Sequence, residues 1–339
     1  MRKRDLMFDL IIYNRALKRF ISFILSREFI VNSKIYQAKY QKEIKKKIEK
    51  FAKKPHRVMI ENTNACNANC SFCPHGKMQR KVGFMSLDLY KKIIDQCARN
   101  SIDYVTVYGF GEPLMDKDFI ERIQYAKQAG LKRVTTNTNA SLLNSDKARE
   151  LLESGIDEVY ISFDAASEET YKKIRCNLDF NSTKKNILNF VRLRNDKNST
   201  TKIYLSFVES DDNKHEVKRY IQEWKGLVDG VSVSLIHNWT GDIESKEFIY
   251  KKSLLRDPCR LLWMDMVINW DGKVPLCCND YEAKVELGDI NSQTIMEVWG
   301  GQRLELIRQN HLKKEFGHIP ICVNCQYNFH YKSPWWVSK

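Results

Sequence analysis

The sequence predicts an α/β protein built on a parallel sheet. Between residues 57 and 240, short β-branched runs alternate with amphipathic helical stretches, and six such strand–helix units follow one another. The expected strands are residues 57–62, 104–108, 133–136, 158–163, 202–207 and 231–235. The expected helices include residues 87–98, 117–129, 145–153, 183–194 and 214–224. Parallel sheets of this kind carry function at the carboxyl ends of their strands, so the loops that follow the strands are the expected place of a site.

Residues 1–55 are expected to form a separate basic, helical extension. The chain has a net charge of +14, and most of the excess Lys and Arg lies in this segment, whereas the rest is nearly balanced. Apolar residues recur at helical spacing from Leu6 to Ile24. The stretch is too charged to span a bilayer. Two interpretations stay open: peripheral contact of residues 1–30 with an anionic membrane surface, or packing on the protein body or a partner. No recognition motif accompanies the charge, so nucleic-acid binding is not expected.

After residue 240 the alternation stops, and residues 241–339 are expected to form a smaller unit. Residues 263–270 and 273–277 look like two strands joined as a hairpin at Asp271-Gly272. A helix is expected over residues 294–308. The unit also contains half of the chain's ten cysteines.

The cysteines indicate metal binding. No secretory signal is recognisable, so a cytoplasmic chain with reduced thiols is expected. Cys66, Cys70 and Cys73 lie within eight residues, just after the first expected strand. Structural zinc takes four ligands, whereas an iron–sulfur cube held by three cysteines keeps one iron open. Spacing alone leaves zinc, completed by His75, as an alternative.

The motif Cys-x3-Cys-x-Phe-Cys at residues 66–73 resembles that of the radical S-adenosylmethionine (SAM) superfamily. The resemblance implies a 4Fe-4S cluster on these cysteines, SAM chelated to the open iron, and Phe72 beside the adenine. It also implies that residues 56–240 form a partial (β/α)6 barrel, similar to a TIM barrel.

Later strand ends resemble the family's SAM-binding motifs in the expected order. Gly111-Glu112 matches part of its Gly-Gly-Glu motif, although Phe110 replaces the first glycine. The stretch 135–139 resembles Thr-Asn-Gly, with Thr138 where glycine is common. Residues 162–164 followed by residue 175 resemble Ser-x-Asp…Arg. The implied cofactor-binding residues are Phe72, Gly111, Glu112, Asn137, Ser162, Asp164 and Arg175.

Four cysteines of the C-terminal unit could hold a second metal centre, and their spacing suits either a cube or zinc. The segment resembles the SPASM/twitch extension of radical SAM enzymes, a small α+β domain. The resemblance implies one auxiliary 4Fe-4S cluster, since no cysteine follows the last of the set. The implied ligands are Cys259, Cys277, Cys322 and Cys325, and the adjacent Cys278 is the alternative to Cys277.

The resemblance implies reductive cleavage of SAM to a 5′-deoxyadenosyl radical, which takes hydrogen from a small-molecule substrate. A sugar or aminocyclitol oxidation is the leading hypothesis. The alternatives are a peptide or protein maturase and, from another class, a zinc-stabilised binding protein. A reductant such as flavodoxin or ferredoxin would supply the electron. Oxidation also needs a base, for which the late strand ends offer Glu209, Asp211, His215 and His237.

Overall fold

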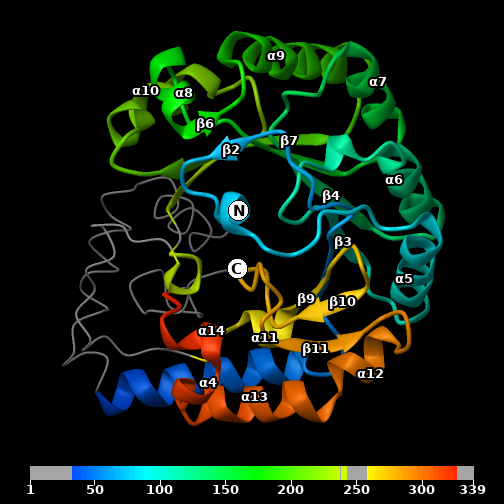
Figure 1. Cartoon of the computed structure of the whole chain (residues 1–339), viewed down its shortest axis with the longest axis vertical. Helices are drawn as coiled ribbons and strands as arrows, with labels where there is room; N and C mark the ends of the chain where they lie inside the picture. The colour runs from blue at the N-terminus through cyan, green and yellow to red at the C-terminus, as the bar shows by residue number, and fades with distance from the viewer. Residues whose placement is uncertain (1–32, 237, 243–257, 327–339) are drawn as a thin grey trace.

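A curved, parallel seven-stranded sheet forms the centre of the molecule (Figure 1). The structure is a computed structural model and describes residues 33–236, 238–242 and 258–326. The strand order is β8-β7-β5-β4-β3-β1-β9, and every neighbouring pair is parallel. The strands are β1 (Arg57–Ile60), β3 (Tyr104–Val107), β4 (Arg133–Thr138), β5 (Glu158–Ser162), β7 (Lys202–Glu209), β8 (Gly230–Leu235) and β9 (Asp265–Ile268). The predicted α/β class and the six strands of the partial barrel are confirmed.

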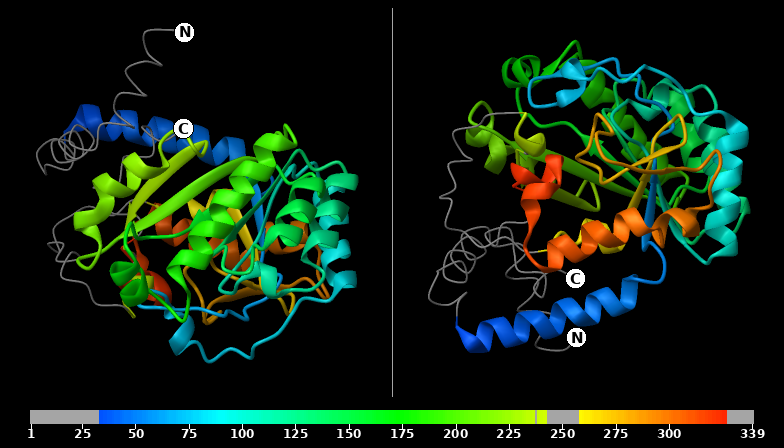
Figure 2. Two further views of the ribbon diagram at one scale, coloured as in Figure 1. Left: turned by 90° about the horizontal axis from the view of Figure 1, so that it is seen from above. Right: turned by 60° about the horizontal axis from the view of Figure 1, so that its bottom comes forward.

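Helices cover the convex face of this sheet (Figures 1 and 2). They are α5 (Leu87–Arg99), α6 (Phe119–Gln128), α7 (Ser145–Glu153), α8 (Glu168–Ile174), α9 (Phe180–Asp196) and α10 (Val217–Trp224). Strand β7 shows why the sheet has two different faces: Ile203, Leu205 and Phe207 are fully buried in the hydrophobic core, while the alternate residues Tyr204 and Ser206 are only half-buried. The apolar set therefore packs under the helices, and the polar set faces the inside of the barrel.

Two short segments that the sequence did not predict tie the barrel mouth together. Strand β2 (Asn69–Cys70) pairs antiparallel with β6 (Arg175–Cys176), in the register that sets Cys70 opposite Arg175. The N–H of Ser71 also donates to the carbonyl of Ile174 (3.0 Å). The loop with the first three cysteines is thereby fixed to the segment that follows α8.

The expected hairpin in the C-terminal unit is wrong in its pairing. The turn at Asp271-Gly272 exists, with Gly272 at φ +91°, a conformation that favours glycine. However, β9 joins the main sheet beside β1, and β10 (Lys273–Pro275) pairs instead with β11 (Glu286–Asp289). Residues 261–264, partly assigned to the first strand, form helix α11 (Leu261–Met264). The apolar strand β9 gains burial on the parallel sheet, which a two-stranded hairpin does not offer.

The helix expected over residues 294–308 is divided in two. Helix α12 (Ile295–Trp299) ends at Gly300-Gly301, and α13 (Gln302–Leu312) continues to residue 312. Two glycines in succession favour a break because they have low helix propensity. Short α14 (Pro320–Val323) contains Cys322, and Cys325 follows it.

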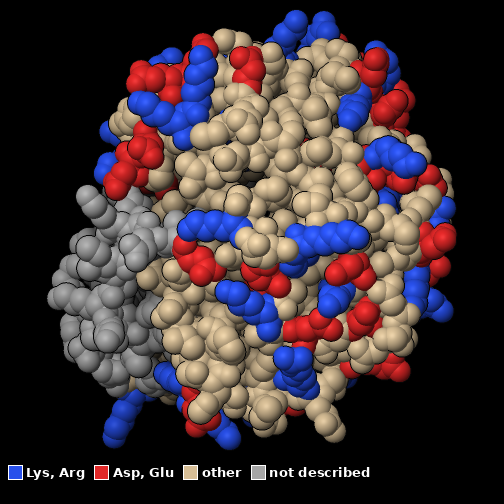
Figure 3. Space-filling model, in the orientation of Figure 1, with Lys and Arg blue, Asp and Glu red and all other residues tan. Residues whose placement is uncertain are grey.

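Helix α4 (Lys34–Phe51) lies at the same end of the molecule as α11 and α13 (Figure 1). It belongs to the basic extension, residues 1–55, that the sequence predicted to be helical. Residues 1–30, the proposed membrane contact, lie outside the described residues. Among the described helices, none is long and apolar enough to cross a membrane. Figure 3 shows Lys and Arg interspersed with Asp and Glu on the face that it presents.

Candidate active site and auxiliary metal centre

The first three cysteines lie together on the loop after β1. Their thiols are half-buried and close enough to influence one another electrostatically: burial, together with Glu112, Cys70 and Cys73, raises the pKa of Cys66 to about 11. Burial also raises the pKa of Cys73, against the opposing effect of a hydrogen bond from the His75 backbone. Three thiols on one short loop give the donor set that a cube with one open iron requires.

His75, which a zinc site would recruit, has one ring nitrogen engaged elsewhere. Its Nε2 lies 2.8 Å from the carbonyl oxygen of Asn64. Since a carbonyl only accepts, this nitrogen carries the proton and donates it to Asn64. Within the part of the chain that the structure describes, no three His, Cys, Asp or Glu side chains form a group that could hold a single metal ion.

Arg175 and Asp164 form a buried ion pair beside the cysteine loop. Arg175 Nε donates to Asp164 Oδ2 (2.6 Å), and a second guanidinium nitrogen donates to the same oxygen. Arg175 Nη1 lies 3.3 Å from the Cys70 sulfur, and the guanidinium lies 5.4 Å from the centre of the Phe72 ring. Burial acts against the charge of Arg175, but Asp164 and Cys70 outweigh it and raise its pKa, so the side chain stays cationic. The structure thus brings Phe72, Asp164 and Arg175 together at the cysteines.

Asp164 is held in a conformation that few residues adopt. Its φ of +47° lies in the left-handed region, and its side chain is fully buried. The backbone N–H of Val208 donates to Asp164 Oδ1 (2.5 Å), and Asn213 Nδ2 donates to the backbone carbonyl of Asp164 (2.9 Å). Neighbouring strand ends therefore fix the carboxylate that orients Arg175.

The Gly-Phe-Gly-Glu loop packs directly on the backbone that precedes Cys66. A Cβ on Gly111 would lie 2.5 Å from the carbonyl oxygens of Thr63 and Ala65, so only glycine allows this approach. Glu112 is 2% exposed and accepts hydrogen bonds from the Thr138 hydroxyl (2.6 Å) and the Asn139 N–H (2.7 Å). Burial raises the pKa of Glu112, although these hydrogen bonds oppose the shift. Glu112 thereby links the loop after β3 to the carboxyl end of β4.

A polar network that the sequence did not predict supports the cysteine loop from the other side. Asn67, between Cys66 and Cys70, accepts a hydrogen bond from Asn139 Nδ2 (2.9 Å) and donates to the Ser141 hydroxyl (2.8 Å). The role of Asn67 and Asn139 becomes visible only in the folded chain, because their loops are distant in sequence.

The concave face of the sheet is lined with hydroxyl and amide groups. The strand register places Thr106 beside Thr135, Ser162 beside Ser206, and Ser206 beside Ser232. The Thr106 and Thr135 hydroxyls are 2.9 Å apart, and those of Ser162 and Ser206 are 3.2 Å apart. The register also places Asn137 beside Tyr160, on the same face. Nearer the amino ends of β3 and β4, Arg133 bonds Glu158 (2.8 Å) and lies over the Tyr104 ring (4.2 Å). The barrel therefore has a polar wall and an ionic, aromatic floor.

The four proposed bases are not brought together. Asp211 pairs with Lys214 (2.6 Å) with about half of its side chain exposed, and His215 is 66% exposed. Glu209 is 5% exposed and follows Phe207 on the helix-covered face of β7. His237 lies outside the described residues. The geometry of the three described residues gives no support for proton transfer inside the barrel.

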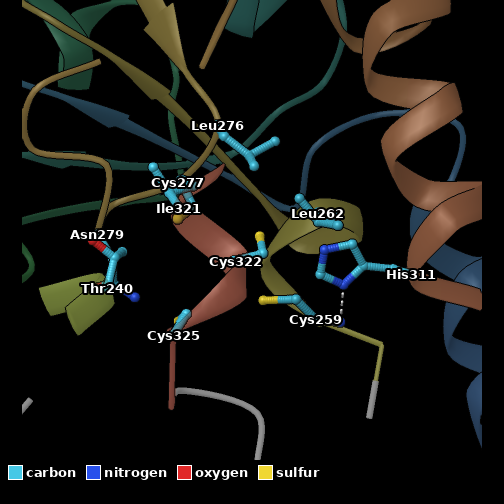
Figure 4. Close-up of a pocket in the computed structure, with 10 residues that line it drawn as sticks. All are labelled: Thr240, Cys259, Leu262, Leu276, Cys277, Asn279, His311, Ile321, Cys322 and Cys325. Atoms are coloured by element: carbon cyan, nitrogen blue, oxygen red, sulfur yellow. Dashed lines mark hydrogen bonds between the residues drawn. The ribbon is translucent and has the colours of Figure 1, made fainter. Parts of the chain in front are cut away.

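Four of the five cysteines of the C-terminal unit line one small pocket (Figure 4). Its lining includes Cys259, Cys277, Cys322 and Cys325, together with the apolar Leu262, Leu276 and Ile321. Burial raises the pKa of Cys277 well above its usual value, and Cys278, Cys259 and Cys325 add to the shift.

Cys278 has different surroundings from Cys277. It is not among the residues that line the pocket, and the charges that act on it come first from Asp265 and Arg57, at the β9–β1 junction. The geometry therefore favours Cys277 over Cys278 as the fourth donor of the pocket.

Comparisons with known proteins agree with this architecture. The family model of the radical SAM superfamily matches residues 60–221, and that of SPASM, an iron–sulfur cluster-binding domain, matches residues 259–326. The matched segments contain the two cysteine groups described above. The chain belongs to the radical SAM superfamily, and its barrel is followed by a SPASM domain. These domains imply 4Fe-4S clusters and SAM as cofactors, which favours cubes over zinc.

Among curated relatives, the probable GTP 3′,8-cyclase of Methanococcus maripaludis is 29% identical over 140 residues, which are 41% of this chain and 46% of the relative. The chain thus spans less than half the length of the first curated relatives that it matches.

Solved structures share the fold. BtrN, in complex with AdoMet and 2-DOIA, superimposes with a TM-score of 0.56 and 17% identity over 80% of this chain and 93% of BtrN. SuiB of Streptococcus suis, bound to the precursor peptide SuiA, gives a TM-score of 0.61 and 15% identity over 78% of this chain and 69% of SuiB.

Proposed function

We propose that this chain is a radical SAM oxidoreductase whose substrate is a small, hydroxyl-rich metabolite such as a sugar or aminocyclitol. The observation that carries the proposal is the set of half-buried or exposed polar side chains on the concave face, Asn137, Ser162, Ser206 and Ser232. Hydroxyl groups both donate and accept, which suits a substrate with several hydroxyls. A polyol would exchange its bonds to water for bonds to this wall.

In the proposed activity, SAM held at the first cluster would supply a 5′-deoxyadenosyl radical able to remove a hydrogen atom from the substrate. The chain's own residues would hold the cluster and orient SAM. We propose Cys66, Cys70 and Cys73 as the ligands of the SAM-binding cluster. Asp164 orients Arg175, whose guanidinium contacts Cys70 and lies over Phe72, where its positive charge suits an anionic group of the cofactor. Gly111 allows the loop before Cys66 to pack closely.

We further propose Cys259, Cys277, Cys322 and Cys325 as the ligands of one auxiliary cluster, which would accept an electron in a net oxidation. The division into residues 1–55, 56–240 and 241–339 is part of the same proposal. So are a flavodoxin or ferredoxin as reductant, and a cytoplasmic location with peripheral membrane contact through residues 1–30.

Isotope transfer tests the substrate class. Reconstituted protein, SAM and reductant are incubated anaerobically with deuterated sugars, deuterated aminocyclitols or deuterated peptides. We expect deuterium in 5′-deoxyadenosine from a polyol. Transfer from peptides alone would establish a maturase and overturn the proposal.

A pair of serine variants tests the wall. Ser206→Ala removes a hydroxyl from the concave face, whereas Ser199→Ala removes one from the loop before β7, where it bonds Thr201. We expect a KM increase of about tenfold for Ser206→Ala, the equivalent of one hydrogen bond, and no change for Ser199→Ala. Equal KM values in both variants would contradict a substrate-binding wall.

A further inference from the structure

His311 is a buried imidazole in the auxiliary pocket that no sequence motif indicates. It comes from α13, is 1% exposed, and lines the pocket with the four cysteines (Figure 4). The ring of Phe316 packs edge-on against it, with the ring centres 4.9 Å apart. The residue therefore has a fixed orientation beside the proposed metal centre.

One ring nitrogen is assigned by its partner. The backbone N–H of Cys259 donates to His311 Nδ1, at 3.1 Å. A backbone N–H can only donate, so Nδ1 carries a lone pair and the proton of the neutral ring is on Nε2. Figure 4 shows both ring nitrogens on the side of the ring that faces the cysteines. The ring thus accepts from one ligand residue and keeps a second, donating group in a pocket lined mainly by sulfur and apolar side chains.

We propose that His311 is a positioning residue for the auxiliary cluster, and that its Nε2–H donates a hydrogen bond to a sulfur of that cluster. The inference rests on the proposed auxiliary cluster, but not on the identity of the substrate. Its Nδ1 fixes the backbone of Cys259, and its Nε2–H stabilises negative charge on sulfur. Hydrogen bonds to cluster sulfurs and residues beyond the ligands tune reduction potentials, because reduction adds negative charge to the cluster.

The reduction potential of the auxiliary cluster tests this role. A background with Cys66, Cys70 and Cys73 changed to Ala removes the other cluster and leaves the full chain otherwise intact. In this background we expect His311→Phe to shift the reduction equilibrium about tenfold toward the oxidised state, 59 mV for one electron. His311→Gln keeps a donor near the Nε2 position, so we expect its reduction potential to lie close to that of the protein with His311. His318→Phe is the control, since His318 is an exposed histidine nearby in sequence. An unchanged potential in His311→Phe would overturn the proposal.

A spectroscopic measurement covers the case in which a variant does not fold. Protein with 15N-labelled histidine and the reduced auxiliary cluster is examined by pulsed electron paramagnetic resonance. A weak 15N coupling, as a hydrogen bond gives, supports the proposal. A strong coupling would show His311 to be an iron ligand, and no coupling would show no contact; either result overturns it. Neither measurement involves a substrate, so a wrong substrate class would leave both results unchanged.

Discussion

At the residue scale, the chemistry depends on a few side chains held by buried contacts. The pair Asp164–Arg175 is the clearest case: both residues are buried, the carboxylate sits on left-handed backbone, and the guanidinium reaches Cys70. Burying a charge costs free energy that only a well-formed pair recovers, so breaking the pair leaves an uncompensated charge. Strained backbone of this kind tends to occur at functional sites.

The first prediction concerns the shape of the cation at position 175. Arg175→Lys keeps the charge but loses the planar guanidinium, which contacts Asp164 and Cys70 at the same time. We expect iron binding to be retained, while 5′-deoxyadenosine formation falls by about 10- to 100-fold, the equivalent of one or two charge-assisted hydrogen bonds. Iron analysis and chromatography of the product measure the two effects. A wild-type rate would show that the fork has no role in SAM cleavage.

The sequence could predict residues that belong to short motifs, but not residues that meet only in the fold. Asp164 and Arg175 were predicted because they match a motif of the family that the sequence resembles. Asn67 and His311 were not, since their partners Asn139 and Cys259 lie far away in the chain. A single Asn or His carries no signal until tertiary packing supplies its partner.

At the element scale, the barrel mouth is stabilised by contacts between successive strand–helix units. Glu216, in the turn that precedes α10, accepts hydrogen bonds from the Ala166 N–H (2.6 Å) and the Thr170 hydroxyl (2.9 Å), and another from the Ser167 hydroxyl. These groups belong to the start of α8, where a negative charge is favourable. Glu216 therefore joins the segment before Arg175 to the next unit.

This contact predicts a pH dependence. Burial raises the pKa of Glu216, but the hydrogen bonds from Ser167, Ala166 and Thr170 outweigh it, and the net pKa lies below 4.5. A lowered folded-state pKa means that the contact stabilises the protein fully above pH 4.5 and loses its effect as pH falls through the folded value. We expect Glu216→Gln to lose about 1–3 kcal/mol at pH 7 and less in acid, measured by denaturant unfolding. Glu150→Gln, at an exposed position of α7, serves as the control, and an equal loss at every pH would contradict the ionic contact.

Element types were more predictable than element pairing. Short β-branched runs between helical stretches indicated the six barrel strands, and β5 and β7 show regular alternation of buried and less buried residues. It could not show that β9 joins β1, where Arg57 bonds Asp265 through both carboxylate oxygens (3.1 and 2.7 Å). A turn such as Asp271-Gly272 is a local signal, whereas the choice between a hairpin and the main sheet depends on distant burial.

At the scale of the whole molecule, the barrel and the SPASM domain share one interface. Arg80, after the cysteine loop, bonds both carboxylate oxygens of buried Glu61 (2.9 Å each) and the carbonyl of Tyr281 (2.6 Å). Trp239 links to the cysteine loop through the Phe72 carbonyl (2.8 Å), and Phe110 packs against the rings of Trp239 and Tyr281. The two cysteine groups are thus held in one structure, as electron transfer between substrate and auxiliary cluster would require.

Iron content and SAM cleavage, measured together in the anaerobically reconstituted full chain, test the central claim most directly. We predict about eight irons and eight sulfides per wild-type chain, the content of two cubes, with formation of 5′-deoxyadenosine on addition of SAM and reductant. The variant with Cys66, Cys70 and Cys73 changed to Ala should keep about four irons and form no 5′-deoxyadenosine. Unchanged iron and SAM cleavage in this variant, or a wild-type protein that binds zinc and leaves SAM intact, would contradict the account.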